Sequence, residues 1–260
     1  MAPGSPLRLD HVPVAVDDLA ALAQRLTEEF GFRVRSPARG ENGLATAAIS
    51  FADGTRLELR TVETAPGTDA PGASEAGRYR DLIADGGGGA YLALAAPDLA
   101  EVLEVAGEIE PELAAAHSGT GSRAGFPRGH PLHALLIVGP ETEDVERSGA
   151  EAHTNGAEGL QAVWVMVEDP DRLTRLLLAF GARDCGASRH PEHLYGRALG
   201  IRGGTVYIVD ARLWMADPES APVVSLTVRG GPESISDNIV LGNAGGLWIE
   251  LRPAAPRENG

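Results

Sequence analysis

The chain contains no lysine and only one cysteine, and each shortage excludes a class of chemistry. All 22 basic residues are arginine. Without lysine the chain can form no Schiff base and has neither a P-loop lysine nor a lysine general base. The single Cys185 cannot form an internal disulfide, which fits a cytoplasmic protein. We expect Cys185 to be a small buried hydrophobic residue.

Positive charge is also scarce, because 22 basic residues face 37 acidic ones and the formal net charge is -15. The negative field of the whole chain repels polyanions, so we do not expect nucleic acid as a partner. No stretch approaches the roughly 18 uninterrupted apolar residues of a transmembrane helix. The first ten residues lack the pattern of a signal peptide. We therefore expect a cytoplasmic globular protein with a small-molecule partner; a homodimer stays open.

One sequence pattern returns four times along the chain. Residues 9–26, LDHVPVAVDDLAALAQRL, alternate in the manner of a strand and then place Leu at helical spacing. Either Asp17 or Asp18 is expected to cap the helix. Similar segments start near residues 90 and 160, with Asp98 and Asp169 at their junctions, and a weaker one starts at residue 223.

Each predicted helix is followed by two or three strand-like runs, which in the first unit are 32–35, 45–51 and 55–62. We expect an α+β fold of four such modules. They span about 8–62 and 88–140 in an N-terminal half, residues 1–148, and about 158–212 and 222–253 in a C-terminal half, residues 149–260. The segments 63–90 and 139–159 are predicted to be loops.

Strand alternation places polar residues of the first module on one face. The valines of residues 12–16 face the helix, so His11 faces the other way, and the leucines of residues 55–62 leave Glu58 on the face of His11. A second carboxylate, Glu250, has the equivalent place in a late strand, where the phrase L/I-E-L-R recurs.

Two interpretations of these glutamates remain open. A charged residue within a strand is commonly solvated at an edge, and each glutamate has an arginine two residues on, Arg60 and Arg252 respectively. Alternatively, one imidazole and two carboxylates suit one divalent metal ion such as Mn, Fe, Co, Ni or Zn.

At these residues the chain resembles the glyoxalase-like branch of the vicinal oxygen chelate superfamily. The resemblance lies in DHVPVAV, in DGTR leading into LELR, in HTNGAEGL and in GGLWIELR. It implies βαβββ modules whose curled mixed sheets hold a metal, with His11, Glu58 and Glu250 at the metal positions. It also implies a metal-dependent isomerase, lyase or dioxygenase that acts on a small oxygen-chelating substrate, with Glu58 or Glu250 as the catalytic proton shuttle.

The other modules depart from this ligand pattern. The position of His11 is occupied by Tyr91, Ala162 and Val223 in the second to fourth modules, and that of Glu58 by Ile137 and Ile208 in the second and third. Only the first and fourth modules therefore supply ligand types, and we expect these two to share one cup. The alternative function is a metal-free protein that binds or sequesters a small molecule.

Several residues are weaker candidates for substrate contact. They are His153 and Asn155 in a glycine-containing loop, Trp248 and Arg60 on the ligand strands, and residues 78–80, which we expect to clamp an anionic substrate as part of a lid. The histidine pairs at 130 and 133 and at 190 and 193 are alternatives for completing a metal shell.

Overall fold

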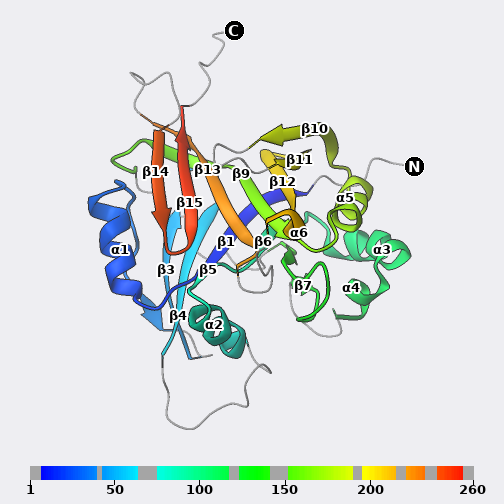
Figure 1. Cartoon of the computed structure of the whole chain (residues 1–260), viewed down its shortest axis with the longest axis horizontal. Helices are drawn as coiled ribbons and strands as arrows, with labels where there is room; N and C mark the ends of the chain where they lie inside the picture. The colour runs from blue at the N-terminus through cyan, green and yellow to red at the C-terminus, as the bar shows by residue number, and fades with distance from the viewer. Residues whose placement is uncertain are drawn as a thin grey trace.

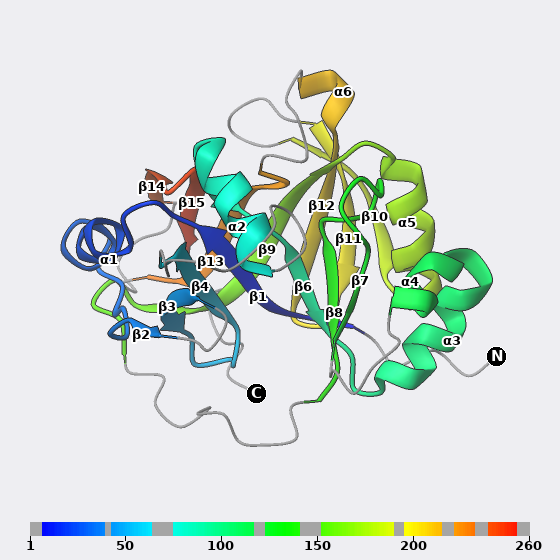
Figure 2. The ribbon, with the colours of Figure 1, turned by 90° about the horizontal axis from the view of Figure 1, so that it is seen from below.

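The computed structural model describes residues 7–39, 43–63, 75–116, 123–140, 152–189, 195–214, 221–231 and 239–253. Within these ranges all fifteen strands join one mixed sheet, accompanied by six helices. Helix α1 lies at one end of the molecule, and α3, α4 and α5 gather at the other (Figures 1 and 2). None of the described helices is both long and apolar enough to cross a membrane.

The first predicted module is present with one difference. Its elements are β1 (Arg8–Ala15), α1 (Leu19–Glu28), β2 (Ala38–Arg39), β3 (Leu44–Ser50) and β4 (Arg56–Val62). The strand expected at 32–35 was wrong. Phe32 is buried in the core, and the N–H of Arg35 donates to the carbonyl of Ala48 at 2.8 Å, but residues 32–35 form no strand.

The second module contains a helix that the sequence pattern did not predict. Its elements are α2 (Glu75–Ala84), β5 (Gly88–Gly89), β6 (Leu92–Ala95), α3 (Leu99–Ile109), α4 (Pro111–Ala116), β7 (Arg123–Gly125) and β8 (Leu135–Val138). Helix α2 lies where a loop was expected. Its apolar side, which includes Ala76, Tyr79 and Leu82, is buried, and the helix contacts β1 and β4.

The remaining elements form the C-terminal part of the sheet. They are β9 (Ala157–Val167), α5 (Pro170–Ala179), β10 (Arg183–Arg189), β11 (Tyr195–Ile201), β12 (Gly204–Asp210), α6 (Ala211–Trp214), β13 (Val223–Gly230), β14 (Ile239–Ala244) and β15 (Leu247–Arg252). Cys185, on β10, is exposed, so the expectation that it is buried was wrong.

Three aspartates cap the helices that open the first three modules, as predicted. The side chain of Asp18 accepts a hydrogen bond from the N–H of Ala21, and Asp98 and Asp169 cap α3 and α5 in the same way. A carboxylate at this position satisfies backbone donors that have no partner within the helix. These caps fix where each strand ends and its helix begins.

In every module one early strand pairs in parallel with the last strand: β1 with β4, β6 with β8, β9 with β12, and β13 with β15. Four such pairs fit four repeated units. Between modules, β1 pairs with β6 and β9 pairs with β13, both antiparallel. The expectation that the first module shares a cup with the fourth was therefore wrong, because modules that follow each other along the chain join edge to edge.

The two halves of the sheet meet at β5, which pairs with both β1 and β13. A Cβ atom on Gly89 would lie 2.6 Å from the Cβ of Val223 and 2.7 Å from its carbonyl oxygen. Only glycine fits between strands that approach this closely. The glycine run at 86–89 thus has a structural role at the junction of the halves.

Candidate functional site

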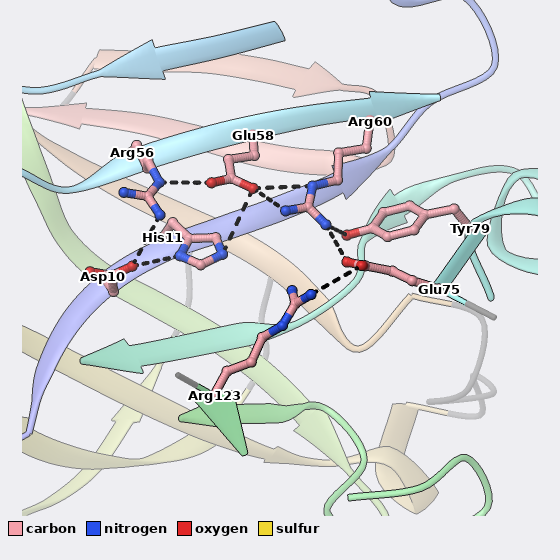
Figure 3. A network of polar contacts seen from close by, with 8 residues as sticks. All are labelled: Asp10, His11, Arg56, Glu58, Arg60, Glu75, Tyr79 and Arg123. Atoms are coloured by element: carbon pink, nitrogen blue, oxygen red, sulfur yellow. Dashed lines mark hydrogen bonds and ion pairs between the residues drawn. The ribbon is translucent and has the colours of Figure 1, made fainter. Parts of the chain in front are cut away.

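His11 and Glu58 lie together on one face of the first module, as the alternation predicts. In the parallel pair of β1 and β4, His11 is opposite Arg56 and Pro13 is opposite Glu58. The Nε2 atom of His11 is 3.8 Å from Oε2 of Glu58 (Figure 3). Both residues are buried.

Asp10 fixes the orientation of the His11 ring. Its Oδ2 atom is 2.6 Å from Nδ1 of His11. Burial would raise the pKa of Asp10, but the hydrogen bond and positive charge of His11 and the nearby arginines lower it below its usual value. An ionised carboxylate can only accept, so Nδ1 donates the proton of this hydrogen bond. The ring therefore directs Nε2 toward Glu58.

Glu58 is held by arginines on both sides. Nε of Arg56 donates to Oε1 at 2.7 Å, and Nη2 of Arg60 donates to Oε2 at 2.5 Å (Figure 3). Burial alone would raise the pKa of Glu58, but the charges of His11, Arg60 and Arg56 outweigh it and lower the pKa to about 2. The carboxylate is therefore ionised, with its charge balanced by side chains of its own strand.

The network continues from Arg60 to two further elements. Nη1 of Arg60 donates to Glu75 of α2 at 2.5 Å and to the hydroxyl of Tyr79 at 3.2 Å. The other oxygen of Glu75 accepts from Nη2 of Arg123, on β7, at 3.4 Å (Figure 3). Side chains of β4, α2 and β7 thus form one continuous polar wall.

A cavity of about 340 Å³ lies beside this wall. Its floor is made by β1, β4, β7 and β8, and α2 supplies one side. The lining residues are His11, Pro13, Arg60, Glu75, Arg78, Tyr91, Arg123, Ala124, Gly125, Phe126, Arg128 and Leu136. All of them belong to the first two modules. The cavity therefore lies next to His11 and the polar wall, and we take it as the candidate site.

The predicted metal ligands do not form a three-ligand set. His11 and Glu58 are close, but Glu250 belongs to β15, which pairs with β13 and β14 in the C-terminal half. Within the ranges that the structure describes, no three His, Cys, Asp or Glu side chains are grouped as a metal ion requires. Arg56 and Arg60 also donate hydrogen bonds to both carboxylate oxygens of Glu58. The residues present therefore do not fit a divalent metal.

Glu250 is a buried carboxylate of the other half-sheet, 3% exposed. Its strand partner on β13 is Thr227, and among the described residues its Oε1 atom has no hydrogen-bond partner. Trp248, two residues before it, is paired with Ser225. Neither Glu250 nor Trp248 lines the cavity of the first two modules.

The strand register corrects three of the predicted module equivalences. His11 lies two residues before the partner of Glu58, and Ser225 lies two residues before the partner of Glu250, so Ser225 takes the place expected for Val223. Ile137 and Ile208 are both buried in the hydrophobic core. In the second module it is Leu136, paired with Ala93, that lies on the cavity face.

His153 and Asn155 join segments of the backbone rather than line the cavity. Nδ1 of His153 accepts from the N–H of Arg33 at 2.9 Å, and Nε2 contacts the carbonyl of Ser50 at 3.2 Å. The side-chain amide of Asn155 donates to the carbonyl of Phe30 at 2.7 Å. Both residues anchor the segment that leads into β9.

The remaining histidine candidates do not converge on the site. His130 stacks on Phe126 with ring centroids 4.2 Å apart, and Nδ1 of His133 contacts the carbonyl of His130. His130 therefore supports a cavity residue from behind. The pair at 190 and 193 lies outside the described residues.

The sequence predicted some of the residues that line the cavity but not others. Arg60 and Arg78, both proposed as substrate contacts, line it, although Arg78 lies on α2 instead of in a loop. Glu75, Arg123 and Arg128 were missed. In the sequence, Arg123 and Arg128 are visible only as two arginines that flank residues 124–127. That segment has no clear periodicity, so nothing indicated that they line a cavity.

Comparisons with known proteins identify a matching family and similar structures. A family model described as a glyoxalase-like domain matches residues 9–181. A search among curated proteins finds no match. Among solved structures, a hypothetical protein from Staphylococcus aureus has a TM-score of 0.62 at 11% identity, covering 95% of this chain and 99% of that one.

Two dioxygenases are also similar in structure. A catechol 2,3-dioxygenase has a TM-score of 0.54 at 14% identity, covering 99% of this chain and 97% of that one. A variant of homoprotocatechuate 2,3-dioxygenase from B. fuscum has 0.55 at 13%, covering 96% and 72%. Identities this low show a shared fold alone. Because the family model covers well over half of the chain, this protein belongs to the glyoxalase-like family, with the fold of the vicinal oxygen chelate superfamily.

Proposed function

We propose that this chain binds a small oxygen-bearing organic molecule in the cavity of its first two modules, and that it does so without a metal ion at His11 and Glu58. The cavity volume of about 340 Å³ lies within the range of about 300 to 1,000 Å³ that is usual for small-molecule sites.

The observation that carries the metal-free part is the pairing of Glu58 with Arg56 and Arg60. A divalent ion at Glu58 would have to take the carboxylate from two guanidinium groups and then remain beside them. The positive charges of the ion and of the two guanidinium groups would repel each other strongly in this buried site. Among the described residues only His11 lies close enough to act as a second ligand, whereas a catalytic site of this kind usually has three protein ligands.

A second candidate function is the metal-dependent enzyme that the family resemblance implies, an isomerase, lyase or dioxygenase. The contact of 3.8 Å between His11 and Glu58 favours it, because these are the two ligand types in the expected places. The two candidates differ in one measurable property, the binding of a divalent ion by these two side chains.

Metal content and thermal unfolding together test the proposal. Protein purified without chelator should contain far less than one Mn, Fe, Co, Ni or Zn ion per chain. The thermal unfolding midpoint of wild type should be the same with added Mn, Co, Ni or Zn as with chelator. A metal ion that bound only the folded state would raise the midpoint. Glu250→Gln should behave like wild type.

The metal-dependent candidate makes the opposite forecast. Wild type would then carry about one ion per chain. That ion would be lost in both His11→Ala and Glu58→Gln, and retained in His153→Ala, whose ring contacts backbone groups elsewhere. Finding this pattern would overturn the metal-free proposal.

A further inference from the structure

The cavity concentrates positive charge within an acidic chain. Its lining contains four arginines, Arg60, Arg78, Arg123 and Arg128, and a single carboxylate, Glu75, although the chain as a whole carries a net charge of -15. We infer that the cavity binds an organic anion, namely a carboxylate attached to a small apolar or aromatic body. This inference rests on the proposed binding function and adds the class of ligand.

Ion pairs hold several of these arginines and the neighbouring Arg56 around the cavity. Among the described residues their acidic partners include Asp10, Glu58, Glu75 and Asp81. Surroundings of low dielectric focus the field of the guanidinium groups that line the cavity on its interior.

The arginines differ in how tightly they are already held. The side chain of Arg60 is 15% exposed and bound to Glu58, Glu75 and Tyr79, so it serves as a fixed part of the wall. Arg123 reaches in from β7 with about half of its side chain exposed, and its contact with Glu75 is 3.4 Å, near the limit of a hydrogen bond. A ligand carboxylate can offer Arg123 a shorter, bidentate pairing.

Arg78 is positioned by an aromatic ring. Its guanidinium lies 4.0 Å from the centroid of Tyr91, and Nη2 donates to the carbonyl of Ala90 at 3.3 Å. A guanidinium has five N–H donors, so it can bind a backbone carbonyl and an anion at the same time. Stacking also fixes the plane in which those donors point. Arg78 is thus a second anchor, set on α2 at one side of the cavity.

The rest of the lining suits the body of the ligand. Pro13, Tyr91, Phe126 and Leu136 contribute apolar or aromatic surface. Phe126 is held flat by His130 behind it, at an interplanar angle of 4°. A volume of about 340 Å³ is at the lower end of the range for ligand sites, so the body is of the size of a single ring with a short chain.

Three probes of the same shape test the charge. Calorimetric titration with 3-phenylpropionate, its neutral amide and its cationic amine should give binding for the carboxylate, with the amide and the amine at least about tenfold weaker, the ratio that one charge-assisted contact supplies. Inorganic phosphate, which lacks a body, should also bind more weakly. Affinity for the carboxylate should fall as salt is raised.

Variants then locate the binding. Arg123→Gln and Arg78→Gln should each weaken 3-phenylpropionate about tenfold. Arg197→Gln, which removes an exposed arginine paired with Asp184 on β10, should leave it unchanged. Arg78 packs on Tyr91, so circular dichroism must show that Arg78→Gln is folded. Arg123 is about half exposed, so Arg123→Gln tests the inference even if the Arg78 variant does not fold.

Each contrary outcome has its own meaning. Equal affinity for carboxylate and amide, or a loss in Arg197→Gln as large as in Arg123→Gln, would reject the anion while leaving the small-molecule cavity in place. Phosphate binding as tightly as the carboxylate would reject the organic body. Failure of all three organic probes to bind would reject the inference, and a metal bound through His11 and Glu58 would instead reject the proposed function.

Discussion

At the scale of single residues, neighbouring charges decide what Glu58 can do. The sequence predicted that Glu58 and His11 share a face, and the structure confirms it. It also offered Arg60 as a pairing partner, and the structure shows Arg56 taking the same role on the other side. The choice between an ion pair and a metal ligand could not be made from the sequence, because it depends on side-chain rotamers and on which modules meet.

Glu58→Gln tests the ion pair through stability. The pKa of Glu58 is lowered from 4.5 to about 2 in the folded protein. At about 1.4 kcal/mol per unit, ionised Glu58 contributes about 3 kcal/mol to the free energy of unfolding. A lowered pKa stabilises above the unfolded value, so this contribution is present above about pH 4.5 and is lost as the pH falls toward 2.

Urea unfolding of wild type and Glu58→Gln at pH 7 and pH 3 measures this. We expect the two proteins to differ most at pH 7 and to converge at the lower pH. Asp184→Asn, which removes an exposed partner of Arg197, should match wild type at both values. A Glu58 variant as stable as wild type at pH 7 would contradict the pairing.

At the scale of elements, local signals were reliable where the chain itself caps a helix and unreliable where tertiary contacts decide. The aspartates at 18, 98 and 169 predicted three helix starts, because capping depends only on nearby backbone donors. Helix α2 was missed because its surroundings are rich in Gly, Pro and Asp, and its apolar residues gain their burial from β1 and β4. That omission also hid the helix that supplies one side of the cavity.

Gly89→Ala tests the junction that β5 makes between the two half-sheets. The added methyl group would meet Val223 at 2.6 Å, and overpacking of this kind destabilises by about 1 to 3 kcal/mol. Gly125→Ala is the matched control, because its new methyl group would find its nearest neighbour at 3.4 Å. Chemical denaturation of both variants should show a loss for Gly89→Ala alone, and equal losses would argue against a close junction at β5.

At the scale of the whole molecule, an ion pair between a buried glutamate and a half-buried arginine also joins the two halves. Glu110, at the end of α3, is 1% exposed and accepts from Arg172, at the start of α5, at 2.7 and 2.6 Å. The sequence did not predict this contact. It also suggested the wrong pairing of modules, because equivalent residues in two repeats do not reveal which repeats are neighbours. The grouping of Glu250 with His11 as ligands led to that wrong pairing.

Arg172→Met should lower the free energy of unfolding by about 3 kcal/mol, since it leaves the buried carboxylate of Glu110 without its partner. The double variant Arg172→Met, Glu110→Leu should recover most of that loss, because no unpaired charge remains. Denaturant unfolding of wild type, both single variants and the double variant forms a closed cycle. Additive losses in the double variant would show that the two side chains do not act as a pair.

The central claim is that the cavity binds an organic carboxylate through its arginines and no metal through His11 and Glu58. The most direct measurement is a crystal structure of the protein grown with 3-phenylpropionate and Zn²⁺, with diffraction collected on both sides of the zinc absorption edge. We predict density for the carboxylate within hydrogen-bond distance of Arg123 or Arg78, and no anomalous peak beside His11 and Glu58. An anomalous peak within about 2.2 Å of Nε2 of His11 and of a Glu58 oxygen would contradict the account.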